Sequence, residues 1–113
     1  MLIFDIDAVR RALEAMESRY KEFMRVENMS AGLYRLKAGE NDPQKPHGED
    51  EVYFVTRGRA KFAAGENIQE VGAGSFIFVE AHREHRFVDI TEDLEVLVIF
   101  APPEGSAASA LKQ

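Results

Sequence analysis

The chain of 113 residues contains no cysteine and no tryptophan. The lack of cysteine excludes disulfides, thiolate metal sites and a cysteine nucleophile. No apolar run approaches the roughly 18 residues that a membrane-spanning helix requires. The N-terminus, MLIFDIDAVRR, places its acidic residues before its arginines and has no cleavable apolar core, so it does not resemble a signal peptide. We therefore expect a cytoplasmic protein that has no membrane partner.

Basic residues are also too few for nonspecific nucleic-acid binding. Fourteen Lys and Arg stand against twenty Asp and Glu, which gives a formal net charge of −6. Nonspecific binding to nucleic acid needs a basic face that displaces counterions, so we expect no nucleic-acid partner. Hydrophobic residues make up 45% and charged residues 30% of the chain, a balance that indicates one soluble globular domain.

Helical periodicity is confined to the first twenty residues. Val9, Leu13, Met16 and Tyr20 follow one another at helical spacing and share one face. Asp7 is suited to cap the helix at its N-terminus. We expect this helix to pack on the outside of the main fold or on a partner subunit.

After the helical segment, short apolar or alternating runs follow one another, separated by turn residues. Arg57 and Gly58 are expected to form a tight hairpin turn between two of these runs. Many short strands without crossover helices predict an all-β sandwich or barrel. The expected strands are residues 22–26, 30–37, 51–56, 59–64, 67–71, 75–79, 85–90 and 94–101.

The chain is expected to divide into a helix, a barrel and a tail. The helix comprises residues 1–20 and the barrel residues 21–101. Residues 102–113, which are rich in Pro, Gly, Ser and Ala, are expected to form a flexible tail. The hydrophobic core of the barrel is expected to contain the aromatic side chains of Phe62, Phe76 and Phe78.

Histidine is scarce, and two of the three histidines suggest a metal site. His47 is followed by carboxylates as far as Glu51, and His85 opens an expected strand. A straight strand would hold His47 and Glu51 about 13 Å apart, so both reach one ion only if the chain bends. Gly48 permits that bend. The alternative for His47 is an ordinary loop histidine, with the carboxylates after it forming a solvated acidic strand edge. The alternative for His82 is an exposed histidine in a turn.

The same residues resemble two motifs of the cupin superfamily. Gly39, His47, Glu51 and Gly58 match the spacing of the first motif, and Gly74 and His85 match the second. The resemblance covers about residues 30–101. It implies an all-β double-stranded β-helix, or jelly-roll barrel, of the kind found in small single-domain bacterial cupins.

The resemblance also implies a divalent transition metal, Fe, Mn, Ni or Zn, bound by His47, Glu51 and His85. The chain departs from the family pattern at Lys45, which stands where the first histidine of the motif belongs. A protonated lysine is a poor ligand, so Gln44, Glu49 or water would have to fill the fourth position.

Two functions follow from the resemblance and remain open. The first is a metal-dependent enzyme of the dioxygenase or isomerase kind that acts on a small oxygen-bearing molecule, with Glu49 or Tyr53 as acid or base. The second is a non-catalytic small-molecule-binding or accessory cupin with a degenerate metal site, which Lys45 favours. We expect a homodimer formed through the N-terminal helix and the early strands.

Overall fold

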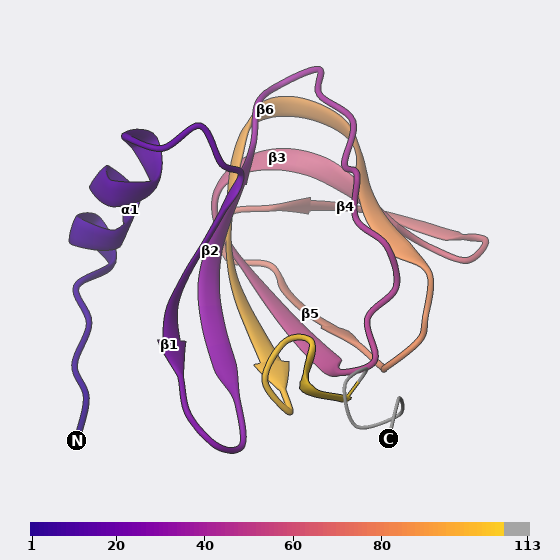
Figure 1. Ribbon diagram of the computed structural model, residues 1–113. Helices are drawn as coiled ribbons and strands as arrows, with labels where there is room; N and C mark the ends of the chain where they lie inside the picture. Colours follow the sequence, from indigo (N-terminus) through magenta and orange to yellow (C-terminus); the bar gives the residue numbers. More distant parts are fainter. Residues whose placement is uncertain (108–113) are drawn as a thin grey trace.

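The computed structural model describes residues 1–107, and its all-β architecture with one N-terminal helix confirms the expected fold class (Figure 1). No helix among these residues is long and apolar enough to span a membrane. The elements are α1 (Ile6–Glu14), β1 (Tyr20–Arg25), β2 (Ser30–Leu36), β3 (Asp50–Ala64), β4 (Asn67–Gly72), β5 (Phe76–Val79) and β6 (His85–Ala101).

Two of these strands are much longer than the sequence suggested. The expected strands 51–56 and 59–64 form the single strand β3, and the last two expected strands form β6. The expected hairpin turn at Arg57 and Gly58 is therefore wrong. The strand continues through both residues, and Arg57 and Arg59 pair with β6 across shifts of register that mark a bulge and bend at Gly58. Gly58 supports the bulge because its φ of 95° suits a residue without a side chain.

The bends in β3 and β6 close the sheet into a barrel. The first half of β3 pairs with β5, whereas its second half pairs with β4. β6 runs antiparallel beside both halves, and the strand order is β1-β2-β6-β3-β4 with β5 added on β3 (Figure 1). β4 and β5 thus form two separate edges.

The N-terminal helix is shorter than its periodicity suggested. It starts at Ile6, and the side chain of Asp5 accepts a hydrogen bond from the backbone of Asp7, so Asp5 and not Asp7 is the N-cap. Tyr20 belongs to β1. Leu13 is the buried residue of the helix and packs toward β1 and β2. The helix therefore covers its own sheet.

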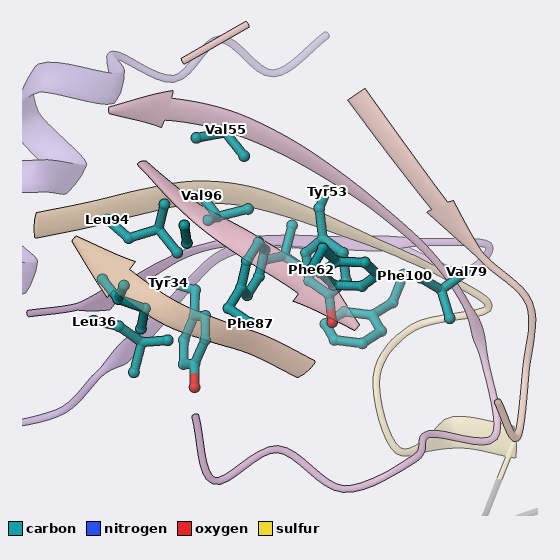
Figure 2. Packing of buried hydrophobic residues seen from close by; sticks show 13 residues of the cluster. Tyr34, Leu36, Tyr53, Val55, Phe62, Val79, Phe87, Leu94, Val96 and Phe100 are labelled. Atoms are coloured by element: carbon teal, nitrogen blue, oxygen red, sulfur yellow. The ribbon is translucent and has the colours of Figure 1, made fainter. Parts of the chain in front are cut away.

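Aromatic side chains fill the barrel interior. The ring centroids of Phe62 and Phe87 lie 5.0 Å apart, and Tyr53 lies 5.8 Å and 5.5 Å from them (Figure 2). The expectation for Phe62 is confirmed. Phe76 and Phe78 are instead exposed by 69% and 59%, because the alternation of β5 directs them outward.

Candidate functional site

The hydroxyl group of Tyr53 stands at the centre of a buried polar cluster inside the barrel. It lies 2.5 Å from Glu51 Oε2, 2.8 Å from His85 Nε2 and 2.7 Å from Gln44 Oε1. Tyr53, Glu51 and His85 are each almost fully buried. Burial and the neighbouring Glu51 carboxylate raise the pKa of Tyr53, so its hydroxyl stays protonated at neutral pH. It can donate to one of its acceptors at a time.

His85 is fixed from both sides of its ring. Its Nδ1 donates to the carbonyl oxygen of Arg83 at 2.7 Å, and its Nε2 faces Tyr53 and lies 3.3 Å from Glu51 Oε1. Burial opposes a charged imidazole, but the contacts with Glu51 and the Arg83 carbonyl outweigh it and raise the pKa of His85. The result is an oriented imidazole whose polar atoms are hydrogen-bonded within the protein.

Asp42 organises the loop that precedes β3, although no motif or spacing in the sequence singled it out. The carboxylate accepts hydrogen bonds from the Tyr34 hydroxyl at 2.6 Å and from the Phe87 backbone at 2.9 Å. It also accepts from the backbone and side chain of Gln44 at 3.2 Å and 2.7 Å. Asp42 thereby places Gln44 against Tyr53. An aspartate before a proline predicts a turn, whereas these partners come from distant strands.

His47 is the third of the expected metal ligands, beside Glu51 and His85. Its Nε2 lies 3.9 Å from Glu51 Oε1, and its ring centroid is 6.4 Å from that of His85. The backbone carbonyl of His47 accepts a hydrogen bond from His82, which holds the two loops together. The fold therefore brings His47, Glu51 and His85 together at one end of the barrel.

Glu49 and Lys45 make none of the contacts described for this group. Glu49 is buried and accepts hydrogen bonds from the backbones of Gly105 and Ala107 at 3.0 Å and 3.2 Å. It thus ties the segment after β6 to the barrel as far as Ala107, and residues 108–113 of the expected flexible tail lie outside the described residues. Lys45 is exposed.

Comparison with known proteins identifies the family of the chain. The family model of the cupin domain matches residues 32–100. The chain belongs to the cupin family. An uncharacterized protein of Streptomyces coelicolor is 47% identical to it over 104 residues, which cover 92% of this chain and 99% of that one.

Two solved structures resemble the fold of the chain. The cupin is similar to TT1209 from Thermus thermophilus, with a TM-score of 0.70 and 26% identity over 91% of this chain and 99% of that one. It is also similar to a cupin from Methanocaldococcus jannaschii that has a double-stranded β-helix fold, with a TM-score of 0.69 and 15% identity over 86% and 90% of the two chains.

The metal ligands implied by the family do not fit an ion as they are arranged here. Among residues 1–107, no group of three or more His, Asp or Glu side chains is placed to hold a metal ion. The hydroxyl of Tyr53 lies 2.8 Å from His85 Nε2 and 2.5 Å from Glu51 Oε2. A metal ion bound by His85 would have to approach the same Nε2 atom to about 2.1 Å, on the side where this hydroxyl stands.

Tyr20 is a further polar residue of the barrel, although the sequence analysis placed it on the N-terminal helix. Its ring lies between those of Tyr34 and Phe100, at 6.4 Å and 6.5 Å. Its hydroxyl is buried, and no hydrogen-bond partner for it stands among the described residues. A Cβ atom on Gly32 would lie 2.1 Å from this hydroxyl, so Gly32 makes the position of Tyr20 possible.

A cavity of about 530 Å³ opens between the edges of β4 and β5. Phe62, Ile77 and Val79 form apolar parts of its lining, while Gln69 and Arg83 contribute polar groups. Phe62 also packs on the ring of His85, at 5.9 Å. The cavity therefore adjoins the Tyr53 cluster across a single aromatic ring. Its volume is in the range of small-molecule sites.

Proposed function

We propose that this cupin binds a small organic molecule without a metal ion, as a non-catalytic binding or accessory protein. The observation that carries the proposal is the hydroxyl of Tyr53 at hydrogen-bond distance from both Glu51 and His85. Internal hydrogen bonds replace the coordination bonds that these groups would make to an ion. A buried polar network that satisfies its own members also rigidifies the barrel around it.

The two remaining candidates for the fourth ligand position support the same conclusion. Gln44 directs its amide oxygen at Tyr53 and its amide nitrogen at Asp42. Glu49 accepts hydrogen bonds from the backbone after β6, and this contact argues against a role as the acid or base. The oxygens of both side chains are thus within hydrogen-bond distance of donors of the protein itself.

The second candidate is the metal-dependent enzyme acting on a small oxygen-bearing molecule. It is favoured by the convergence of His47, Glu51 and His85, because Glu51 Oε1 lies 3.9 Å and 3.3 Å from the two Nε2 atoms. Fe, Mn, Ni or Zn would suit two imidazoles and a carboxylate. Tyr53 would have to leave the cluster first.

Metal content distinguishes the two candidates. Tag-free protein incubated anaerobically with Fe(II), Mn(II), Ni(II) or Zn(II) and then desalted is expected to retain less than about 0.1 equivalents of metal by plasma mass spectrometry. Tyr53→Phe, which removes the hydroxyl that faces Glu51 and His85, is expected to retain more. Tyr34→Phe removes a buried hydroxyl on Asp42 and serves as the control. About one equivalent in the parent, lost in His85→Ala, would establish the metal enzyme instead.

The ligand is expected to bind in the cavity between β4 and β5. Gln69 pairs with Phe62 across the strands and points into the barrel, whereas Ile68 points outward. Gln69→Trp should fill the cavity and weaken the fluorescence-detected binding of 1-anilinonaphthalene-8-sulfonate about tenfold. Ile68→Trp, which adds a similar ring on the outer face, is the matched control. Equal affinities of both variants and the parent would place the ligand elsewhere.

A further inference from the structure

A second cavity, of about 660 Å³, lies between α1 and the sheet. Its lining comes mainly from α1, from the segment between α1 and β1, and from β2, β3 and β6 around Glu95. It shares no lining residue with the cavity between β4 and β5. Its volume is in the range of small-molecule sites, and the binding function proposed above does not involve it.

Three arginines surround Glu95 on the floor of this second cavity. Strand pairing places Arg35 of β2 and Arg57 of β3 opposite Glu95 of β6, and all three residues line the cavity. Residues that stand opposite one another in paired strands have Cβ atoms about 5 Å apart. Arg10 reaches the same carboxylate from α1 and donates to Glu95 Oε2 through Nη2 at 2.8 Å. Three guanidinium groups therefore lie near one carboxylate.

Glu95 neutralises only one of these positive charges. Its side chain is buried, and burial opposes its charge, but the hydrogen bonds from Arg10 and Thr56 and the charges of Arg10 and Arg57 outweigh burial and lower the pKa of Glu95. The carboxylate is therefore ionised at neutral pH. One negative charge against three guanidinium groups leaves a surplus of two positive charges on the floor, in a chain whose formal net charge is −6.

Arg35 and Arg57 retain hydrogen-bond donors for a ligand. Arg35 donates through Nη2 to the carbonyl oxygen of Met16 at 2.7 Å, which uses one of the several N–H groups of its guanidinium. Among residues 1–107, neither arginine forms a salt bridge with a carboxylate. A guanidinium binds carboxylate and phosphate groups through two parallel N–H···O bonds, and this geometry selects an oxyanion as the ligand.

The other acidic residues of the cavity are either bonded already or exposed to water. Glu40 pairs with Arg19 at 3.0 Å, and Asp93 accepts a hydrogen bond from a backbone amide at 2.9 Å. Glu14 and Glu17 are exposed on the helix side, where solvent screens their charges. The potential that a molecule meets on the floor of the cavity is therefore positive.

We propose that this cavity binds a small molecule with a doubly charged oxyanion, a phosphate monoester or a dicarboxylate, held between the guanidinium groups of Arg35 and Arg57. The two negative charges match the surplus of positive charge on the floor. Leu13 and Met16, the latter exposed by 40%, offer apolar surface for the organic part of the molecule. Because the site lies outside the barrel, its test is independent of the cavity between β4 and β5.

Isothermal titration calorimetry of the full chain at low ionic strength tests the proposal with phenyl phosphate and phthalate. At least one of them is expected to bind with a Kd of about 1 mM or tighter. The affinity should fall when NaCl is raised to about 0.3 M, because salt screens the guanidinium charges. Tighter binding of phenyl phosphate would identify a phosphate monoester, and tighter binding of phthalate a dicarboxylate. Benzyl alcohol carries the ring without the charges and should not bind.

Arg57→Gln should weaken binding of the better probe at least about tenfold, because one of the two guanidinium contacts is lost. Arg59→Gln is the matched control, since Arg59 is exposed on the same strand, pairs with Glu92 at 3.4 Å and does not line the cavity. Arg35→Lys keeps the charge but loses the planar fork, and it should weaken binding about fivefold.

Far-UV circular dichroism checks that each variant keeps its fold. Failure of both probes to bind at about 10 mM would overturn the proposal. An equal loss in Arg57→Gln and Arg59→Gln would also overturn it, because binding would then depend only on the overall charge. Loss of binding in Gln69→Trp, which fills the cavity between β4 and β5, would show that the probes bind there instead.

Discussion

Replacing Asp42 by alanine is expected to lower the free energy of unfolding by about 3–5 kcal/mol. The carboxylate is 7% exposed and accepts four hydrogen bonds, two from Gln44 and one each from Tyr34 and Phe87. Alanine would leave the Tyr34 hydroxyl and the Phe87 amide buried without partners. Each unsatisfied donor costs about 1–3 kcal/mol, in addition to the stabilisation that the charge-assisted bonds provide.

Urea denaturation followed by circular dichroism measures this loss. Asp93→Ala is the control, because Asp93 is exposed and accepts one hydrogen bond from the backbone of Ala38. Its loss should cost about 1 kcal/mol. If Asp42→Ala were no more destabilising than Asp93→Ala, the network between the loop, β2 and β6 would not hold the barrel in the way described.

Gly58→Ala is expected to destabilise the protein by more than about 3 kcal/mol, a loss that leaves little folded protein in a domain of ordinary stability. A Cβ atom at Gly58 would lie 2.2 Å from the carbonyl oxygen of Asp93 and 2.8 Å from the Cα of Leu94. Both are backbone atoms of β6 and cannot move without opening the pairing at the bend. The positive φ of 95° adds strain for any residue with a side chain.

Gly74→Ala separates these two contributions. Gly74 has a φ of 96°, nearly the same as Gly58, but a Cβ atom there would meet nothing within 4 Å. This variant should lose only about 1–2 kcal/mol, the cost of the left-handed backbone. Thermal unfolding of both variants should therefore give a much lower midpoint for Gly58→Ala. Equal midpoints would show that the backbone of β6 can shift at the bend to accommodate the added Cβ atom.

The difference between the expected and observed strands has its origin at this same bend. Arg57 and Gly58 give the local signal of a hairpin turn, and a residue of positive φ serves a turn and a bulge equally well. Whether the chain reverses there depends on β6, which continues beside β3 through the bend. A sequence window of a few residues does not contain that partner.

The candidate site, like the strands, was predicted only in part from the sequence. The resemblance to the family motifs predicted that His47, Glu51 and His85 lie together, and Glu51 Oε1 lies 3.9 Å and 3.3 Å from the Nε2 atoms of the two histidines. Alternation placed Tyr53 on the same face as Glu51, but it did not show that the hydroxyl reaches His85 as well. That contact depends on how far the two strands lie apart inside the closed barrel.

Local periodicity in the sequence was enough to predict the all-β class and the single N-terminal helix. The grouping of the two histidines with Glu51 was implied by the resemblance to the family motifs. The role of Asp42 in the loop, the position of Tyr53 between the expected metal ligands and the outward direction of Phe76 became evident only in the folded chain. Those outcomes depend on contacts between distant strands, because bending of β3 and β6 sets which side chains meet inside the barrel and which stay outside.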